Sequence, residues 1–197
     1  MTLKSYETIS EKDSITKLEE AVRQLILHIG EDPDREGLIQ TPRRVTNSYL
    51  DIFSGYSQSD SEVLSKQFFQ KANLSEYVFL KDIKFYSMCE HHILPMVGTV
   101  DICYMPNQSI VGISKLAKVV DVFSKRLQVQ EKMTNQIAQS IHTNLKPIGV
   151  AVRSKAIHFC MTMRGVRKQD SKMETYSFTG AFKSNQMLRQ EFFSRLS

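Results

Sequence analysis

The residues best suited to chemistry in this chain form two short clusters, Cys89-Glu90-His91-His92 and His158-Phe159-Cys160. Each cluster carries one thiol and at least one imidazole. Catalytic zinc is typically held by three protein ligands and keeps a fourth position open, whereas structural zinc has four protein ligands. The two clusters can supply three ligands and leave imidazoles beside the metal for acid–base work, so they indicate a zinc hydrolase.

The spacing within each cluster supports a shared metal. Cys89 and His92 are three positions apart at the expected exit of a strand, which lets both side chains converge on one ion. His158 and Cys160 are two positions apart in an expected strand, which would place them on the same face. Cys103 lies in a strand with no imidazole nearby in the sequence, so we expect it to be a small buried apolar residue.

Size and composition fit a globular protein with one domain, or one domain with a helical extension. The chain has 197 residues, of which 41% are hydrophobic and 24% charged. No apolar run approaches the roughly 18 residues of a membrane span, so no membrane partner is expected. The cysteine count is three, an odd number, and no signal-peptide core follows Met1, so we expect a reducing, cytoplasmic location without a disulfide framework.

The net charge of +5 leaves several partner classes open. Basic residues are densest around the second cluster, at Arg153, Lys155, Arg164, Arg167 and Lys168. This placement favours a phosphate-bearing small substrate, although a solvated basic surface explains it as well. Aromatic residues do not alternate with basic ones along a face, so nucleic acid is not an expected partner.

Hydrophobic periodicity predicts an α+β fold. Helices are expected over 10–29, from 41 to Gly55, over 114–123 with Ser114 as the cap, over 129–145 and over 185–196. Strands are expected over 79–88, 97–105, 148–153, 156–164 and 174–182, and 56–78 is ambiguous. The order suggests a helical extension (1–56) before a catalytic domain (57–197) with an antiparallel sheet covered by helices on one face. Open sheet edges would then favour assembly of several subunits.

Two further segments could contact a nucleotide. Gly112-Ile113-Ser114-Lys115 leads into a helix, whose N-terminal N–H groups and dipole favour a phosphate, and Lys115 and Lys118 share a helix face. An ordinary N-cap followed by solvated lysines explains this segment as well. Gln130-Glu131 at the start of the next helix could recognise an N–H edge such as that of guanine, or Glu131 could simply suit the helix dipole.

At these residues the chain resembles the GTP cyclohydrolase I family, and the resemblance runs from about residue 15 to the C-terminus. The motifs that carry it are Glu31-Asp32-Pro33-Asp34-Arg35-Glu36-Gly37-Leu38, Thr41-Pro42-Arg43-Arg44-Val45, Ile52-Phe53-Ser54-Gly55-Tyr56, Cys89-Glu90-His91-His92, Gly112-Ile113-Ser114-Lys115-Leu116, Gln128-Val129-Gln130-Glu131, His158-Phe159-Cys160 and Arg164-Gly165-Val166. These motifs are long, ordered and jointly specific.

The resemblance implies a role for each site residue. Zinc would be held by Cys89, His92 and Cys160; His91 and His158 would flank the reaction centre; Gln130 and Glu131 would contact the guanine, Ser114 the ribose, and Lys115, Lys118, Arg164 and a neighbouring subunit's Arg44 the triphosphate. It also implies the tunnelling fold, in which subunit sheets join into a β-barrel. The assembly would be an allosteric homodecamer with active sites between subunits.

The implied reaction converts GTP into formate and 7,8-dihydroneopterin triphosphate, the first step of folate and pterin biosynthesis. Water activated by zinc would attack C8 of guanine, His158 would protonate N7, and His91 would hydrogen-bond or relay a proton. Ser114 would assist ribose opening before the rearrangement that closes the pterin ring.

The chain departs from the commonest family pattern at three positions. Lys118, Leu127 and Lys132 stand where members often carry Arg, Pro and Arg. Lysine keeps the charge of arginine but loses its bidentate fork, so phosphate binding is less secure at Lys118 than at Lys115 or Arg164.

Two other classes of protein are alternatives to this interpretation. Other tunnelling-fold enzymes that act on purines or pterins need either a nucleophilic cysteine with NADPH or a three-histidine metal site, and neither matches the two clusters. A non-enzymatic zinc module would need a fourth protein ligand, for which Cys103 is the remaining thiol.

Overall fold

The computed structural model describes residues 11–69 and 77–196. The chain divides into two compact units between Ile52 and Phe53, and each is described by itself. The first unit holds α1 (Glu11–His28) and α2 (Thr41–Ile52), close to the two helices expected there. Gly30, with φ of +88°, follows α1, a left-handed conformation that suits glycine.

The second helix ends earlier than its sequence pattern predicts. Instead of continuing to Gly55, α2 stops at Ile52, and a separate 3-10 turn, η1 (Ser54–Ser57), begins the second unit. Gly55 lies against the backbone of the Lys125 region, where an added Cβ would come within 2.5 Å of the carbonyl oxygen of Val122. The glycine is therefore needed for a close approach between two chain segments.

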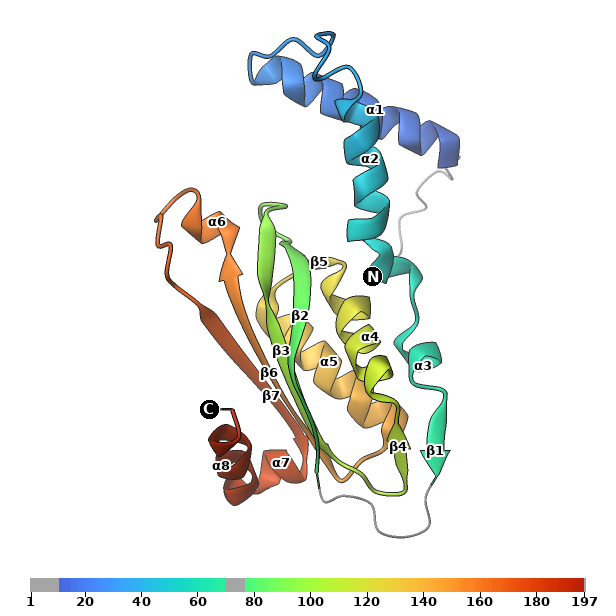
Figure 1. The fold of residues 1–197 in the computed structure, drawn as a ribbon, viewed down its shortest axis with the longest axis vertical. Helices are drawn as coiled ribbons and strands as arrows, with labels where there is room; N and C mark the ends of the chain where they lie inside the picture. The colour runs from blue at the N-terminus through green and yellow to red at the C-terminus, as the bar shows by residue number, and fades with distance from the viewer. Residues whose placement is uncertain (1–10, 70–76, 197) are drawn as a thin grey trace, which may run out of the picture. The chain divides into compact units, whose positions relative to one another are not determined.

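The second unit is built on one five-stranded sheet (Figure 1). Its strand order is β5 (Leu127–Gln128), β2 (Val78–Cys89), β3 (Pro95–Met105), β6 (Gly149–His158) and β7 (Met173–Gly180). All neighbours are antiparallel except β5, which pairs parallel to β2 through two residues. This arrangement confirms the predicted α+β class and the mainly antiparallel sheet.

Helices cover one face of this sheet along most of its length. They are α4 (Ile113–Ser124) and α5 (Gln130–Leu145); in Figure 1, α4 lies to the right of β2 and α5 passes partly behind the strands. The ambiguous 56–78 stretch contains α3 (Asp60–Val63) and β1 (Gln67–Phe69), and β1 pairs with β4 (Ser109–Val111) in a small second sheet. Residues 70–76 lie outside the described part of the chain.

The main core lies between the sheet and these two helices. Its fully buried side chains include Phe85, Val100, Ile102, Tyr104, Leu116, Val120, Ile137, Ile141 and Val152. On α5, Met133, Ile137 and Ile141 recur at four-residue steps, which places them on one helix face. This packing holds α5 against the sheet, so the first residues of α5 lie near the strand ends that carry the two clusters.

A smaller core lies on the opposite face of the sheet, under α7 (Ala181–Ser184) and α8 (Gln186–Ser194). It includes Phe182, Phe192 and Cys103, whose side chain is 1% exposed. Burial raises the pKa of the Cys103 thiol to about 12, because the thiolate would be poorly solvated there. The prediction that Cys103 is a buried apolar residue is confirmed.

The prediction of two strands over 148–153 and 156–164 is wrong. One continuous strand, β6, runs to His158, because residues 154 and 155 pair with β3 on one side and β7 on the other. The pairing of β6 with β3 ends there, with His158 opposite Met96, the second residue of β3. The chain instead forms a one-turn helix, α6 (Phe159–Thr162).

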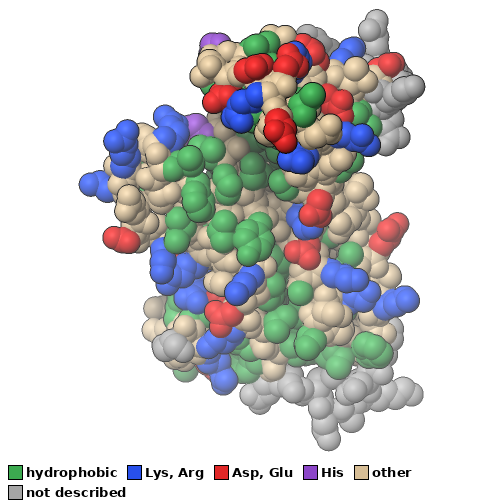
Figure 2. All heavy atoms as spheres, turned by 45° about the horizontal axis from the view of Figure 1, so that its top comes forward, with side chains coloured by type: hydrophobic (Ala, Val, Ile, Leu, Met, Phe, Trp, Pro, Cys, Tyr) green, Lys and Arg blue, Asp and Glu red, His purple; other side chains and the backbone are tan. Residues whose placement is uncertain are grey.

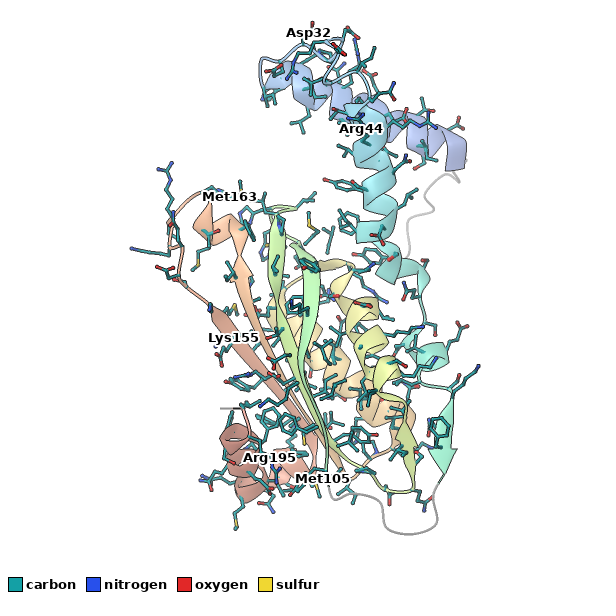
Figure 3. The ribbon with its side chains drawn as sticks, in the orientation of Figure 1. Asp32, Arg44, Met105, Lys155, Met163 and Arg195 are labelled. Carbon is teal, nitrogen blue, oxygen red and sulfur yellow. The ribbon has the colours of Figure 1, made fainter. Side chains whose placement is uncertain are left out.

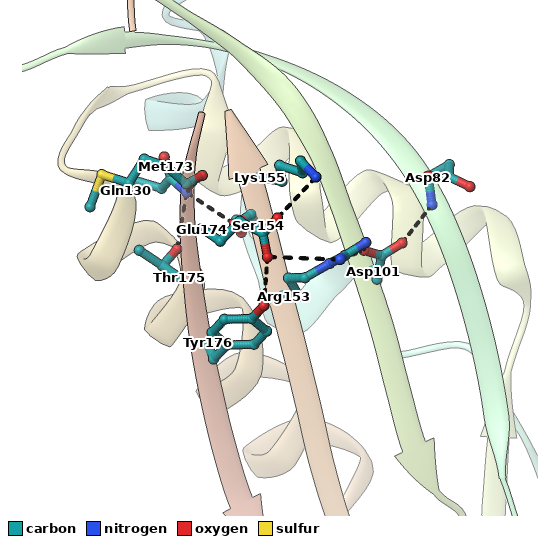
Figure 4. A network of polar contacts seen from close by, with 10 residues as sticks. All are labelled: Asp82, Asp101, Gln130, Arg153, Ser154, Lys155, Met173, Glu174, Thr175 and Tyr176. Atoms are coloured by element: carbon teal, nitrogen blue, oxygen red, sulfur yellow. Dashed lines mark hydrogen bonds and ion pairs between the residues drawn. The ribbon is translucent and has the colours of Figure 1, made fainter. Parts of the chain in front are cut away.

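The face of the sheet away from α4 and α5 carries a network of charges (Figure 4). Asp101 is completely buried; it accepts hydrogen bonds from Arg153 Nε at 2.8 Å and from the backbone N–H of Asp82 at 2.9 Å. Glu174 pairs with Lys155 at 2.9 Å and accepts a hydrogen bond from the Tyr176 hydroxyl. These contacts compensate the loss of hydration that a buried carboxylate would otherwise suffer.

Exposed hydrophobic side chains are also numerous in this unit, and Figure 2 shows green side chains gathered beside blue lysines and arginines on the face turned to the viewer. Those at least 38% exposed include Tyr86, Ile93, Phe159, Met163 and Val166. Within residues 11–69 and 77–196, every helix is too short or too polar to cross a membrane.

Truncating Ile137, a fully buried side chain of α5, tests the packing between α5 and the sheet. We expect Ile137→Ala to lower the free energy of unfolding by about 2–5 kcal/mol, because it leaves a cavity at a fully buried position. Ile113→Ala removes the same atoms from a side chain that is 66% exposed and should change it by less than about 0.5 kcal/mol. Urea denaturation of both variants measures the difference, and equal effects would contradict the described core.

Candidate metal centre and active site

A tight turn between β2 and β3 brings Cys89 and His92 together. Cys89 is the last residue of β2, and its carbonyl oxygen accepts hydrogen bonds from the N–H groups of His92 at 3.3 Å and Ile93 at 2.9 Å. The N–H of Cys89 donates to the carbonyl oxygen of Leu94 at 2.9 Å, and Ile93 adopts a left-handed φ of +52°. This closed turn places Cys89 Sγ 3.8 Å from His92 Nδ1.

The second cluster reaches the same place through the end of β6. Pro95 pairs with Met88, and Met96 pairs with His158, so the ends of β2 and β6 flank the start of β3. The expectation that His158 and Cys160 share one face of a strand is wrong, because Cys160 lies in α6 and His158 is its N-cap residue. The helical turn, rather than strand alternation, carries the Cys160 thiol to the first cluster.

The resulting group of Cys89, His92 and Cys160 has the donor set of a zinc site. Their ligand atoms all lie within 4.8 Å of one another. Tetrahedral zinc with bonds of about 2.3 Å to sulfur and about 2.0–2.1 Å to nitrogen would separate a sulfur from a nitrogen by about 3.6 Å. The observed 3.8 Å between Cys89 Sγ and His92 Nδ1 therefore fits one shared ion.

The electrostatics of the two thiols also favour a cation. Burial, followed by the neighbouring Cys89, raises the pKa of the Cys160 thiol, and Arg164 opposes this rise. Two thiolates this close repel one another, and a divalent ion between them would remove the repulsion. Three protein donors leave one coordination position for solvent or substrate, as in catalytic zinc sites.

His91 lies at the rim of this group. Its side chain is 65% exposed, its ring packs edge-on against the ring of His92 with centroids 6.2 Å apart, and its Nε2 is 3.9 Å from Glu90 Oε1. Glu90 also lies 3.9 Å from Lys132 Nζ. His91 is therefore accessible to a ligand. The turn that carries it is closed by the hydrogen bond from the N–H of Cys89 to the carbonyl oxygen of Leu94.

His158, in contrast, is held by a buried partner. Its Nε2 lies 2.7 Å from Oε1 of Gln130, a residue that is completely buried at the start of α5. Burial lowers the pKa of the His158 imidazole, and the nearby carboxylate of Glu131 partly opposes this shift. Gln130 and Glu131 thus lie beside His158, which the order of residues in the sequence alone did not show. The Glu131 side chain is exposed.

Sequence reasoning missed the hydroxyl groups behind Gln130. Thr134 Oγ1 lies 2.6 Å from Thr175 Oγ1 and 2.9 Å from Ser154 Oγ, and all three residues are at most 9% exposed. They come from α5, β6 and β7, so no local pattern links them. Buried hydroxyls at inward positions of strands are the sole sequence signal, and it is a weak one.

The expected phosphate-binding residues separate into two places. Arg164 follows α6 and influences the Cys160 thiol. Ser114, Lys115 and Lys118 lie on α4, whose last residue leads to β5 beside Met88 and Cys89. The twelve residues of α4 span about 18 Å. Its first turn therefore lies far from Cys89, His92 and Cys160 of the same chain, which are called the metal group below.

The predicted cap of α4 is wrong. Gly112 occupies the N-cap position without a side-chain hydrogen bond, the helix begins at Ile113, and Ser114 is exposed in the first turn. Glycine at the N-cap leaves the first turn open, so Ser114 Oγ is not used as a cap.

In Figure 3, Met163 marks the end of α6 beside the candidate site, and Lys155 lies farther down the sheet. Arg44 belongs to the first unit, where it is exposed on α2.

The α+β fold and a three-donor Cys–His–Cys group flanked by two histidines define a candidate metal-dependent hydrolase. The comparisons with known proteins agree. A model of the GTP cyclohydrolase I family matches residues 18–197. The chain therefore belongs to the GTP cyclohydrolase I family, a family of enzymes.

Relatives named GTP cyclohydrolase 1 match over nearly their whole length. The protein of Rickettsia felis is 55% identical over 92% of this chain and 95% of its own length. The protein of Rickettsia africae is 57% identical over 88% and 91%, and that of Rickettsia prowazekii is 50% identical over 94% and 98%. Among solved structures, an archaeosine synthase QueF-Like in the apo form is 18% identical, covers 55% of this chain and 97% of its own, and gives a TM-score of 0.47.

Removal of either thiol tests whether Cys89, His92 and Cys160 bind zinc together. Zinc-loaded wild-type protein should contain about one zinc per chain, and Cys89→Ala or Cys160→Ala should lose it, because each removes one of three ligands. Cys103→Ala is the matched control, since that thiol lies in the smaller core under α7 and α8. Zinc analysis after dialysis measures the ratio, and full retention in either site variant would rule out the proposed ligand set.

Proposed function

We propose that this protein hydrolyses GTP at C8 of guanine and rearranges the product, giving formate and 7,8-dihydroneopterin triphosphate at the start of folate and pterin biosynthesis. The observation that carries the proposal is the convergence of Cys89, His92 and Cys160 beside His91 and His158. Membership of the GTP cyclohydrolase I family supports the same reaction.

Zinc is the metal that suits this donor set, because two thiolates and one imidazole match its preference for sulfur and nitrogen. When bound, zinc lowers the pKa of coordinated water to about 7 and so makes hydroxide available at neutral pH. Cys89, His92 and Cys160 would hold it. A reducing compartment such as the cytoplasm would keep both thiols free to do so.

The imidazole of His158 is the proposed donor of a proton to N7 as the imidazole ring of guanine opens. It lies at the end of β6, two residues before Cys160, and is half-buried against Gln130. A general acid must lie within hydrogen-bond reach of the atom it protonates, and a fixed ring meets that requirement better than a mobile one. The exposed His91 would hydrogen-bond to the substrate or relay a proton at the rim.

The guanine would be recognised at the start of α5. Glu131 is exposed beside His158, and its carboxylate can accept hydrogen bonds from the N–H groups of the guanine edge. The resemblance places Gln130 on the guanine as well, although its side chain is completely buried.

The triphosphate would be bound by Lys115, Lys118, Arg164 and Arg44, with Ser114 near the ribose. Because α4 spans about 18 Å and its last residue leads to β5, Lys115 lies at the end of α4 that is remote from Cys89 of its own chain. We therefore propose a homo-oligomer, a decamer with a shared β-barrel, in which α4 of one subunit serves the metal group of another. The exposed hydrophobic residues Ile93, Phe159 and Val166 near the site would be covered by that assembly.

Incubation with GTP is the direct test of the reaction. Purified zinc-loaded protein should release formate and a fluorescent pterin in equal amounts, and the apoprotein should release neither. A zinc-replete preparation that leaves GTP unchanged would overturn the proposal.

The role of His158 can be separated from metal binding. We expect His158→Ala to retain zinc, because it is not one of the three ligands, and to slow formate release by at least about 10²-fold, the usual contribution of a general acid. His28→Ala removes an exposed imidazole of α1 and should leave the rate unchanged. Parallel zinc and formate assays decide, and unchanged turnover in His158→Ala would remove it from the chemistry.

The triphosphate contacts predict a selective loss of affinity. Lys115→Ala should raise the KM for GTP about tenfold or more, since a hydrogen bond to a charged phosphate is lost, and should leave the inhibition constant of guanosine nearly unchanged. Lys183→Ala removes the same charge from α7 and is the matched control. If Lys115→Ala weakens GTP and guanosine equally, its assignment to the triphosphate is wrong.

A further inference from the structure

Gln130 is the completely buried polar side chain that connects the start of α5 to the reactive end of β6. Its amide nitrogen lies 3.0 Å from the carbonyl oxygen of Ser154, 3.1 Å from that of Met173 and 3.2 Å from Thr175 Oγ1 (Figure 4). Its other end, Oε1, lies 2.7 Å from His158 Nε2. The side chain therefore connects β6 and β7 to the imidazole of His158 through hydrogen bonds.

These contacts fix which end of the amide is which. The oxygen and nitrogen of a glutamine are easily interchanged, so their placement must follow from their partners. Carbonyl oxygens accept hydrogen bonds and never donate them, so the end that meets Ser154 and Met173 must be the NH₂ group. The end that meets His158 is then the carbonyl oxygen.

The amide orientation in turn fixes the histidine. Because Oε1 can only accept, His158 Nε2 must carry a hydrogen at this 2.7 Å contact. Among the residues that the structure describes, Nδ1 of His158 has no hydrogen-bond partner. Within the described part of the chain, Nδ1 is therefore the ring nitrogen left without a hydrogen bond.

We propose that Gln130 is a positioning residue, which holds His158 with its proton on Nε2 and leaves Nδ1 as the atom that exchanges a proton with the substrate. This assignment rests on the proposed function for its catalytic half. When His158 donates, the Nδ1–H bond breaks, the N7–H bond of the purine forms, and the ring is left neutral with its hydrogen still bound to Nε2. The Nε2–H···Oε1 contact is the same before and after the transfer.

The surroundings of Gln130 make this support rigid. Thr134 Oγ1 donates to the backbone carbonyl oxygen of Gln130 at 2.7 Å, and Thr175 Oγ1 accepts from its amide. The two hydroxyl oxygens lie 2.6 Å apart, so the pair links the backbone of Gln130 to its amide. Reorienting the amide would place an acceptor against two carbonyl oxygens at a completely buried position, which is costly. Gln130 so buried is poorly placed to bind guanine, and the exposed Glu131 remains for that contact.

Gln128 provides a matched control two residues away. It is 1% exposed, and its Nε2 donates to the carbonyl oxygen of Phe123 and to Gln136 Oε1, both at 2.8 Å. Its own Oε1 has no partner among the described residues. Replacement by methionine therefore removes a buried amide at either position, and only at Gln130 does it remove the contact to His158.

The tautomer can be observed directly. Magic-angle-spinning NMR of sedimented, zinc-loaded, full-length protein carrying ¹⁵N-labelled histidine, with His158 assigned by comparison with His158→Ala, should show neutral His158 with a hydrogen on Nε2 and a strongly deshielded Nε2–H proton. Gln128→Met should keep this proton signal and Gln130→Met should lose it. A wild-type His158 whose hydrogen resides on Nδ1 would overturn the proposal, whether or not any variant folds.

Kinetics separate positioning from substrate binding. We expect Gln130→Met to lower kcat for formate release by about 10–10²-fold while KM for GTP stays within about threefold. A large rise in KM with kcat unchanged would show instead that Gln130 binds the guanine. If wild-type protein releases no formate from GTP, the proposed function fails, and the NMR result still decides the contact between Gln130 and His158.

Discussion

The structure depends on bringing two thiols and one imidazole within 4.8 Å of one another from segments far apart in the chain. Neighbouring thiolates repel, and a flexible chain would separate them, so the surrounding fold must hold them in place. The hydrogen-bonded turn after β2 fixes Cys89 and His92, and the helical turn after β6 fixes Cys160. The register of β3 against β2 and β6 then brings these two turns to the same end of the sheet.

The same strand ends also organise the acid–base groups. His158 is the last residue of β6, and its ring is held by Gln130 at the start of α5, while α5 is held by its own buried face against the sheet. The position of the His158 imidazole thus depends on the main core. His91 lies in the exposed turn and lacks such support, so the two histidines differ in environment although both adjoin the metal group.

The chain also keeps apart two groups of residues that are both proposed to contact the nucleotide. The first turn of α4 lies at the end of the helix remote from β5, whereas the metal group lies beside β5. If both bind one nucleotide, as proposed, a second copy of the chain would supply one of them. The exposed hydrophobic side chains of the second unit are consistent with the proposed assembly.

The sequence by itself determined the α+β class, the helices with a clear hydrophobic period, the burial of Cys103 and the identity of the chemical groups, because these follow from residue type and local spacing. Only the tertiary structure decided that β6 continues through residues 154 and 155, that Cys160 stands in a helical turn, that Gly112 rather than Ser114 caps α4, and that Gln130 is engaged by His158. The continuous β6 and the position of Gln130 depend on partners from other elements: a strand is extended by its neighbours on both sides, and an amide is oriented by carbonyl groups contributed by other strands. Such pairings are set by the register of the sheet, which local periodicity does not encode.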